Sequence, residues 1–297
     1  MGSVSARGDR HHVTTGVLAV VVSLGAQNIG AAFAKSLFPL VGPAGMTTLR
    51  IGLSACLLFA INRPWRSPPD RAHFKSLIAY GAVLGIMNNL FYQALARIPV
   101  GIASAIEVTG PLAIVLLSSR RPRDLVWFVT VALGLFLLWP ARAHAALDPL
   151  GVAFAFGAAI CWALYIVFGK RVSGVLGRDA VTWGMLVAAI LTLPVAFVGV
   201  GTSLLSPTVL MAGLAVAALS SALPYSLEMA AMRRLPAYVF SVILSAAPAV
   251  AALAGFVVLG EHLTAMQWFA IACVVIASAG SAISSAQSGK SAEPVSA

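Results

Sequence analysis

Long apolar stretches alternate with short polar ones along the whole chain. Ten stretches reach the length of about 20 mostly apolar residues that a helix needs to cross a bilayer. They are apolar throughout instead of alternating, which excludes the strands of a membrane β-barrel, and backbone groups in lipid are then satisfied only within helices. The sequence therefore predicts an all-α membrane protein with ten transmembrane helices, over residues 13–34, 44–62, 74–96, 98–118, 124–140, 147–169, 179–200, 207–230, 236–259 and 265–286.

The composition agrees with this pattern and excludes other classes. Apolar residues make up 60% of the 297 residues and charged residues 9%, whereas a soluble domain has about 45–50% and about 25%. The net charge of +10 comes from basic residues scattered between apolar stretches, so we expect no nucleic-acid partner. The cysteines Cys56, Cys161 and Cys273 all fall inside spans without metal-ligand spacing. We therefore expect neither a disulfide framework nor a metal site.

The distribution of Lys and Arg sets the orientation. With the N-terminus inside, 15 of the 19 basic residues lie in inner segments and three in outer segments, while Arg50 lies within the second span. This bias predicts that both termini are cytoplasmic. Residues 1–12 then form a cytoplasmic tail, and residues 287–297 form a disordered one. An alternative is that the first span is a signal peptide cleaved after Ala34, although Lys35 follows that site directly.

The two halves of the chain share a weak internal repeat. Pro99 and Pro111 are matched by Pro236 and Pro248 at an offset of 137 residues. One alternative is chance in a chain rich in Ala, Leu and Val; the other is a duplication with residues 13–140 and 147–286 as its halves. Five spans per half is an odd number, so the second half enters the membrane from the opposite side. The fold would then be two inverted five-helix repeats, with prolines that kink helices at their interface.

Three ionisable residues lie inside spans, where an insertion cost of about 2.5–3.5 kcal/mol for a charge makes a functional role the default interpretation. Glu107 is near the middle of the fourth span, Glu228 near the inner end of the eighth and Arg50 in the second. Glu107 is the candidate for proton coupling, with a structural pair to Arg50 as the alternative. Glu228 is a candidate for substrate binding, or it is neutralised at the interface by Arg233 and Arg234.

Further polar side chains occur on spans 3, 4, 6 and 8. Each alone is typical of helix packing, but together they would line a polar chamber. No zinc-binding, hydrolase or ATP-binding motif accompanies them, so we expect no cofactor and no enzymatic activity, and transport would be driven by a gradient. With Arg50 and Glu228, the predicted substrate-binding residues are Asn88, Asn89, Tyr92, Thr109, Trp162, Tyr165 and Tyr225.

Two runs in the chain are distinctive, Glu107-Val108-Thr109-Gly110-Pro111-Leu112 and Leu223-Pro224-Tyr225-Ser226-Leu227-Glu228-Met229. Others are Ala34-Lys35-Ser36-Leu37-Phe38-Pro39, Ser118-Ser119-Arg120-Arg121-Pro122, Cys161-Trp162-Ala163-Leu164-Tyr165 and Leu259-Gly260-Glu261. These runs, in order over nearly the whole chain, resemble the bacterial threonine/homoserine exporters. That family belongs to the ten-helix branch of the drug/metabolite transporter superfamily and is built from two EamA repeats.

The resemblance implies a secondary transporter in the bacterial inner membrane. Its cargo would be a small zwitterionic amino acid, exported from the cytoplasm in exchange for protons. It also implies a central cavity lined by spans 1–4 and 6–9, with spans 5 and 10 peripheral. Val108 and Asn89 depart from the family pattern beside that cavity, which leaves the cargo open, and the sequence predicts no particular oligomeric state.

A carboxylate that accepts either the cargo's ammonium group or a proton, but not both, would couple the two fluxes. We expect Glu107 to be that carboxylate and Arg50 or a kinked-helix terminus to hold the cargo's carboxylate. One alternative is an exporter of broader specificity for metabolites or drugs in the same superfamily. A membrane receptor would need a signalling domain that the short loops do not supply, and an intramembrane enzyme would need catalytic motifs that the sequence lacks.

Overall fold

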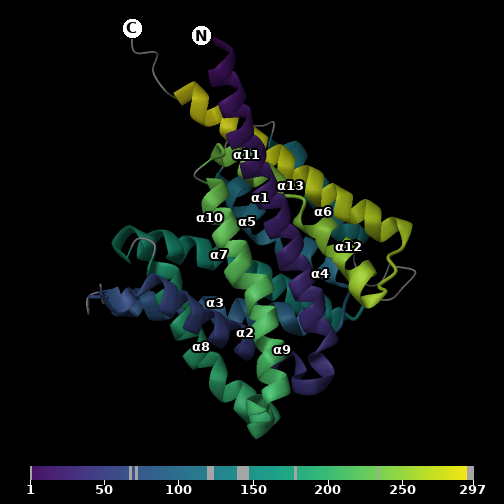
Figure 1. The fold of residues 1–297 in the computed structure, drawn as a ribbon. Coiled ribbons are helices and arrows are strands. Elements are labelled where there is room, and N and C mark those ends of the chain that lie inside the picture. The colour runs from purple at the N-terminus through teal and green to yellow at the C-terminus, as the bar shows by residue number, and fades with distance from the viewer. Residues whose placement is uncertain are drawn as a thin grey trace.

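The structure is a computed structural model that describes residues 2–66, 69–70, 73–118, 124–138, 147–176, 179–232 and 234–292. Every regular element within these ranges is a helix (Figure 1). The α-helices are α1 (Gly2–Ser36), α2 (Phe38–Asn62), α3 (Phe74–Leu95), α4 (Val100–Glu107), α5 (Thr109–Ser118), α6 (Asp124–Leu137), α7 (Pro149–Leu176), α8 (Asp179–Val200), α9 (Pro207–Ala217), α10 (Leu223–Met232), α11 (Ala237–Leu244), α12 (Ala247–Leu259) and α13 (Ala265–Ala292).

Eight candidate membrane spans are present in the described part of the chain. Two of them, Val100–Leu117 and Tyr238–Leu259, each join two consecutive helices. The other two predicted stretches, 124–140 and 207–230, contain shorter apolar helices, Asp124–Leu137 and Pro207–Ala222. The structure therefore confirms a polytopic helical protein and supports eight spans directly, while the count of ten stays a prediction.

Many large hydrophobic side chains are exposed on the surface of the bundle. Val198, Leu117 and Val257 are 91%, 82% and 77% exposed. Contiguous exposed apolar surface marks contact with another apolar phase, and here the helices that carry it have the length of a bilayer crossing. The exposed side chains are consistent with a bundle solvated by lipid.

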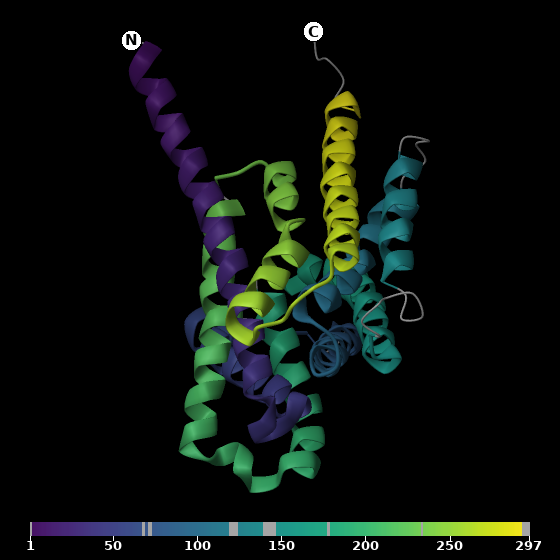
Figure 2. The same ribbon diagram turned by 90° about the vertical axis from the view of Figure 1, so that its right-hand side faces the viewer.

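The helices at both chain ends extend beyond the predicted spans. Helix α1 begins at Gly2, so the predicted tail of residues 1–12 and the first span form one helix. Helix α13 continues to Ala292, which differs from the disorder expected from residue 287 onward. Alanine, serine and glutamine in this segment are compatible with a helix. Both chain ends lie at the same end of the molecule (Figures 1 and 2).

Helices from the first half pack mainly against helices from the second half. Helices α2 and α3 pack against α8, α3 also packs against α7, and α1 packs against α10 and α12. Helix α6 lies along α13, as Figure 2 shows in teal and yellow, and Trp127 Nε1 donates a hydrogen bond to Ser284 Oγ at 3.1 Å between them. The residues between the helices thus come from both halves.

Two spans are broken at matching positions. Helices α4 and α11 have eight residues each, and their N-caps Pro99 and Pro236 have nearly equal backbone angles, φ −58°, ψ 144° and φ −58°, ψ 142°. Proline lacks the N–H that would bond the carbonyl four residues earlier, and its ring clashes with that carbonyl. Four residues before Pro111 and Pro248 are Glu107 and Leu244, which end α4 and α11. The predicted prolines thus accompany an interruption in each span, of one residue between α4 and α5 and of two residues between α11 and α12.

Candidate functional site

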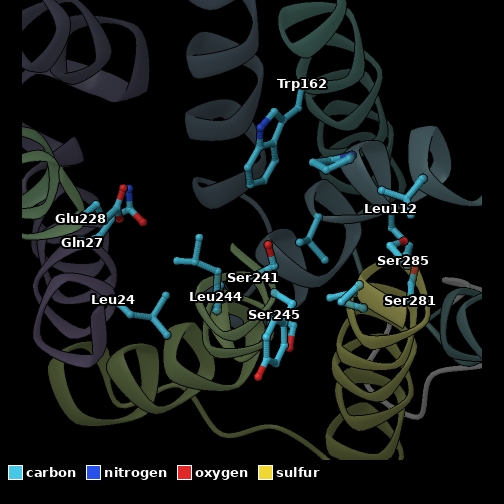
Figure 3. Close-up of a pocket in the computed structure, with 18 residues that line it drawn as sticks. Leu24, Gln27, Leu112, Trp162, Glu228, Ser241, Leu244, Ser245, Ser281 and Ser285 are labelled. Carbon is cyan, nitrogen blue, oxygen red and sulfur yellow. The ribbon is translucent and has the colours of Figure 1, made fainter. Parts of the chain in front are cut away.

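A cavity of about 800 Å³ lies between the helices in the half of the bundle nearer the chain ends. This volume is typical of small-molecule sites. Gln27 of α1, Trp162 of α7 and Glu228 of α10 line it, together with serines of α11 and α13, as Figure 3 shows. The lining residues of α13 come from its second half, toward the C-terminus, which places the cavity on the side of the chain ends.

The carboxylate of Glu228 lies on one wall of the cavity. Glu228 and Gln27 lie on the same side of the cavity in Figure 3, and the Trp162 ring projects from a different wall. Ser23 is fully buried, and its hydroxyl donates a hydrogen bond to Glu228 Oε1 at 2.9 Å. Among the described lining residues Glu228 is the one charged group. The cavity therefore offers a place for a cation.

The two broken spans meet the cavity at their breaks. Val108 follows α4, Ser245 follows α11, and both residues line the cavity. Thr109 Oγ1 donates to the Ile106 carbonyl at 2.6 Å, and Ser245 Oγ donates to the Val242 carbonyl at 2.6 Å. A hydroxyl at each break thus satisfies a carbonyl near the end of the preceding helix.

Arg50, Asn88 and Tyr92 form a polar cluster between α2 and α3. An Arg50 Nη2 N–H donates to Asn88 Oδ1, and the guanidinium lies 5.2 Å from the centre of the Tyr92 ring. Asn88 Nδ2 in turn donates to the Leu84 carbonyl at 2.8 Å. Arg50 Nε and the Tyr92 hydroxyl are buried and have no hydrogen-bond partner among the described atoms. The cluster therefore holds a cation with an unused donor, which is the arrangement an anion needs.

Glu107 lies between these two regions. It is half-buried, it precedes Val108 at the break, and the charge of Arg50 acts on its carboxylate. The two side chains form no ion pair within 4.0 Å; the ion pairs within the described ranges are Lys35–Glu261 and Arg97–Asp148. The structure therefore does not contain the alternative, a close ion pair between Glu107 and Arg50.

The other predicted site residues lie in different surroundings. Tyr165 stacks on Tyr80 with ring centres 5.0 Å apart, inside the packing of α3 and α7. The Thr109 hydroxyl is used within its own helix, and Asn89 is half-buried with no hydrogen bond among the described side chains. The side chain of Tyr225 lies outside those that the structure describes. Of the residues expected to line one polar chamber, Trp162 and Glu228 both line the cavity.

Several lining residues were not predicted from the sequence. Gln27 and Ser245 are isolated polar residues in apolar stretches, where packing is the ordinary explanation. Ser281 of α13 is 3% exposed and borders the cavity, so the tenth span is not peripheral, contrary to the expectation from the resemblance. The serines of α13 recur at 278, 281 and 285. This spacing places them on one face of a helix, and it could have identified that face from the sequence.

Charged groups join the C-terminal end of α1 to the segment before α13. Lys35 Nζ lies 2.6 Å from Glu261 Oε1 and donates to the Ile98 carbonyl at 2.9 Å. Glu261 Oε2 accepts the Val100 N–H at 2.8 Å. The two charged side chains are 20% and 14% exposed. This network joins the end of α1, the start of α4 and the link between α12 and α13.

Apolar helices of membrane-crossing length, arranged around a cavity and buried charges, define a polytopic membrane protein with an internal site. Residues 149–283 match the EamA-like transporter family. The chain is 44% identical over 268 residues to the threonine/homoserine exporter RhtA of Salmonella typhimurium (strain LT2) and to that of Escherichia coli (strain K12), covering 90% of this chain and 91% of each relative. The chain therefore belongs to the EamA-like transporter family, among the relatives of these exporters, and it is a transporter and not an enzyme.

A solved crystal structure of another protein has the same fold. It is 21% identical, superimposes with a TM-score of 0.57, and the match covers 96% of this chain and 99% of that one. At this identity the likeness concerns the arrangement of the helices alone.

Proposed function

We propose that this protein exports small amino acids of the threonine/homoserine type across the bacterial inner membrane, in exchange for protons and by alternating access. The observation that carries the proposal is the 44% identity over 90% of the chain to exporters of that name. Identity of this extent, without large gaps in coverage of either chain, favours a shared cargo class.

The transport cycle would use ten helices in two inverted repeats, residues 13–140 and 147–286. The equal breaks after α4 and α11, 137 residues apart, support the duplication. The excess of Lys and Arg in alternate loops and the location of both chain ends on one side support cytoplasmic termini. Inverted repeats allow one chain to adopt similar inward-open and outward-open states around a central site.

The cargo's ammonium group would first meet Glu228 and Gln27, beside Trp162, because this carboxylate lines the cavity, and would then pass to Glu107. Arg50, held by Asn88 and Tyr92, would bind the cargo's carboxylate with the donor that has no protein partner. Zwitterion binding needs both kinds of group, since each buried charge is costly without a partner.

Glu107 would couple export to proton entry. It lies at the break between the cavity and the Arg50 cluster, so its carboxylate is placed to exchange an ammonium group for a proton. Protonation neutralises the carboxylate and releases the cation, and cation binding requires the proton to leave.

A second candidate is an exporter of broader specificity. The cavity volume of about 800 Å³ exceeds the needs of one small amino acid, and many lining residues, such as Leu112 and Leu244, are apolar. A larger or more apolar molecule would also bury surface there.

Counterflow in proteoliposomes with an imposed pH gradient tests the proposal. Vesicles loaded with unlabelled threonine should take up labelled threonine, homoserine should compete, and a cationic dye should not. Absence of threonine counterflow by folded protein would overturn the proposed function. Counterflow of the dye at a rate comparable to threonine would replace it with the broader one.

A further inference from the structure

One ion-pair network holds together three separate parts of the chain, at the end of α1 and the start of α13. Lys35 terminates α1, Glu261 lies between α12 and α13, and the two backbone partners Ile98 and Val100 flank the start of α4. All four groups are used: the ammonium donates to two oxygens, and the carboxylate accepts from two donors. A pair of this kind, 20% and 14% exposed, is well shielded from water.

The cavity lies at the other end of the same helices. Helix α1 passes the cavity at Leu24 and Gln27 before it reaches Lys35. Helix α13 starts just after Glu261 and borders the cavity only from Ser278 onward. The pair therefore joins the end of α1 to the segment before α13, away from the residues by which these two helices line the cavity.

We propose that the Lys35–Glu261 pair is the outer gate of the transporter, closed in this structure and separated each time cargo leaves. The inference rests on the proposed transport function and adds to it the residues that hold the outward path shut. With the termini cytoplasmic, the structure is then the inward-facing state.

Helix α4 links this gate to the break that carries Glu107. Its N-cap is Pro99, which supplies no side-chain cap, so the Val100 N–H is satisfied by Glu261 instead. Glu107 is the last residue of the same eight-residue helix, about 10 Å from Val100 along its axis at the standard rise. A shift of α4 caused by a change at Glu107 therefore moves the N–H that the gate carboxylate binds.

The internal repeat predicts a second gate at the inner end. Asp124 stands 137 residues before Glu261, Ala237 stands 137 after Val100, and Lys170 stands 135 after Lys35. Lys170 is exposed and forms no ion pair with a described residue. In the outward-facing state we expect Lys170 and Asp124 to come together at the start of α11, as Lys35 and Glu261 do here at the start of α4.

Crosslinking tests whether the pair must separate. In a background free of Cys56, Cys161 and Cys273, the double variant Lys35→Cys/Glu261→Cys is joined by a short bifunctional thiol reagent in proteoliposomes. Threonine counterflow should fall to background when crosslinked and recover on cleavage of the reagent. The matched control is Arg97→Cys/Asp148→Cys, at the exposed ion pair near the same end, where crosslinking should leave counterflow unchanged.

Accessibility supplies a second measurement that does not need an active variant. A reporter cysteine, Ala282→Cys, lies in the cavity and is labelled by a membrane-impermeant thiol reagent added from outside. Adding Glu261→Gln should raise the labelling rate at least about tenfold, a shift of about 1.4 kcal/mol toward the outward-open state. Asp148→Asn, which neutralises the exposed pair, should leave the rate unchanged.

Two results would overturn the gate: counterflow that persists in fully crosslinked protein, or outside labelling of Ala282→Cys that is equal with and without Glu261→Gln. Failure of the unmodified protein to transport threonine would instead count against the proposed function, because the labelling experiment measures the gate without cargo.

Discussion

The two broken spans have nearly the same backbone angles where the first helix ends and different side chains at the break. In the first, α4 ends at Glu107 and Val108 follows; in the second, α11 ends at Leu244 and Ser245 follows. The Val108 N–H bonds the Ser104 carbonyl and the Ser245 N–H bonds the Ser241 carbonyl, again 137 residues apart. The proline that interrupts each span fixes the backbone, while the chemistry at the break differs between the halves.

The prolines are repeated in both halves, whereas the carboxylate proposed to couple export to proton entry is present in one half alone. In the proposed transport cycle, two equivalent breaks would allow the bundle to hinge toward either side, which would give the proline of each half a role. Only the first half brings a carboxylate to its break, with Arg50 within electrostatic range. A proton site in one half is sufficient, because a single titrating group that both sides reach in turn couples the two fluxes.

The largest effect is expected where the two breaks differ in packing. Gly110 lies against α7 so closely that a Cβ atom would be 2.0 Å from the Ala159 carbonyl oxygen. The equivalent residue of the second half is Ala247. Gly110→Ala should destabilise the folded protein by about 3 kcal/mol, the upper range for overpacking, because the obstacle is backbone. Thermal unfolding in detergent, followed by tryptophan fluorescence, measures the change.

The reciprocal substitution is the control. Ala247→Gly adds no atom and should cost only about 0.5–1 kcal/mol through backbone freedom. Equal losses for Gly110→Ala and Ala247→Gly would contradict the close approach of α5 to α7.

An effect smaller than that of Gly110→Ala is expected at the hydroxyls beside the breaks. Thr109 and Ser245 each donate to a carbonyl three residues earlier, at 2.6 Å. Thr109→Ala and Ser245→Ala should each lower stability by about 0.5–1.5 kcal/mol, the usual net value of one hydrogen bond. Similar shifts in the unfolding midpoint would support equal capping of both breaks, and a loss confined to one variant would show that the break in the other span does not depend on its hydroxyl.

Much of the fold could be predicted from the sequence, because apolar length and proline position act locally. The stretches at 98–118 and 236–259 are each recovered as a span with an interruption four residues before a proline. The stretches at 124–140 and 207–230 contain apolar helices shorter than a full crossing. Lipid requires apolar residues all round a helix, so the sequence says where spans lie but not which faces meet.

The site was harder to predict for the same reason. Arg50, Asn88 and Tyr92 were recognisable because polar groups in apolar helices are costly, and the structure brings them together. Tyr165 has the same residue type as Tyr92, yet it stacks on Tyr80 in the packing of two helices. The Lys35–Glu261 pair spans 226 residues of sequence, and no local pattern indicates such a contact.

The most direct measurement of the central claim is the pH inside proteoliposomes that are loaded with threonine and diluted into threonine-free buffer, with the wild-type protein and with Glu107→Gln. Threonine leaving through the wild-type protein should draw protons in and acidify the lumen, whichever way the protein is inserted. Glu107→Gln, folded and inserted to the same extent, should give no acidification. Acidification by Glu107→Gln at the wild-type rate would show that this carboxylate does not carry the proton.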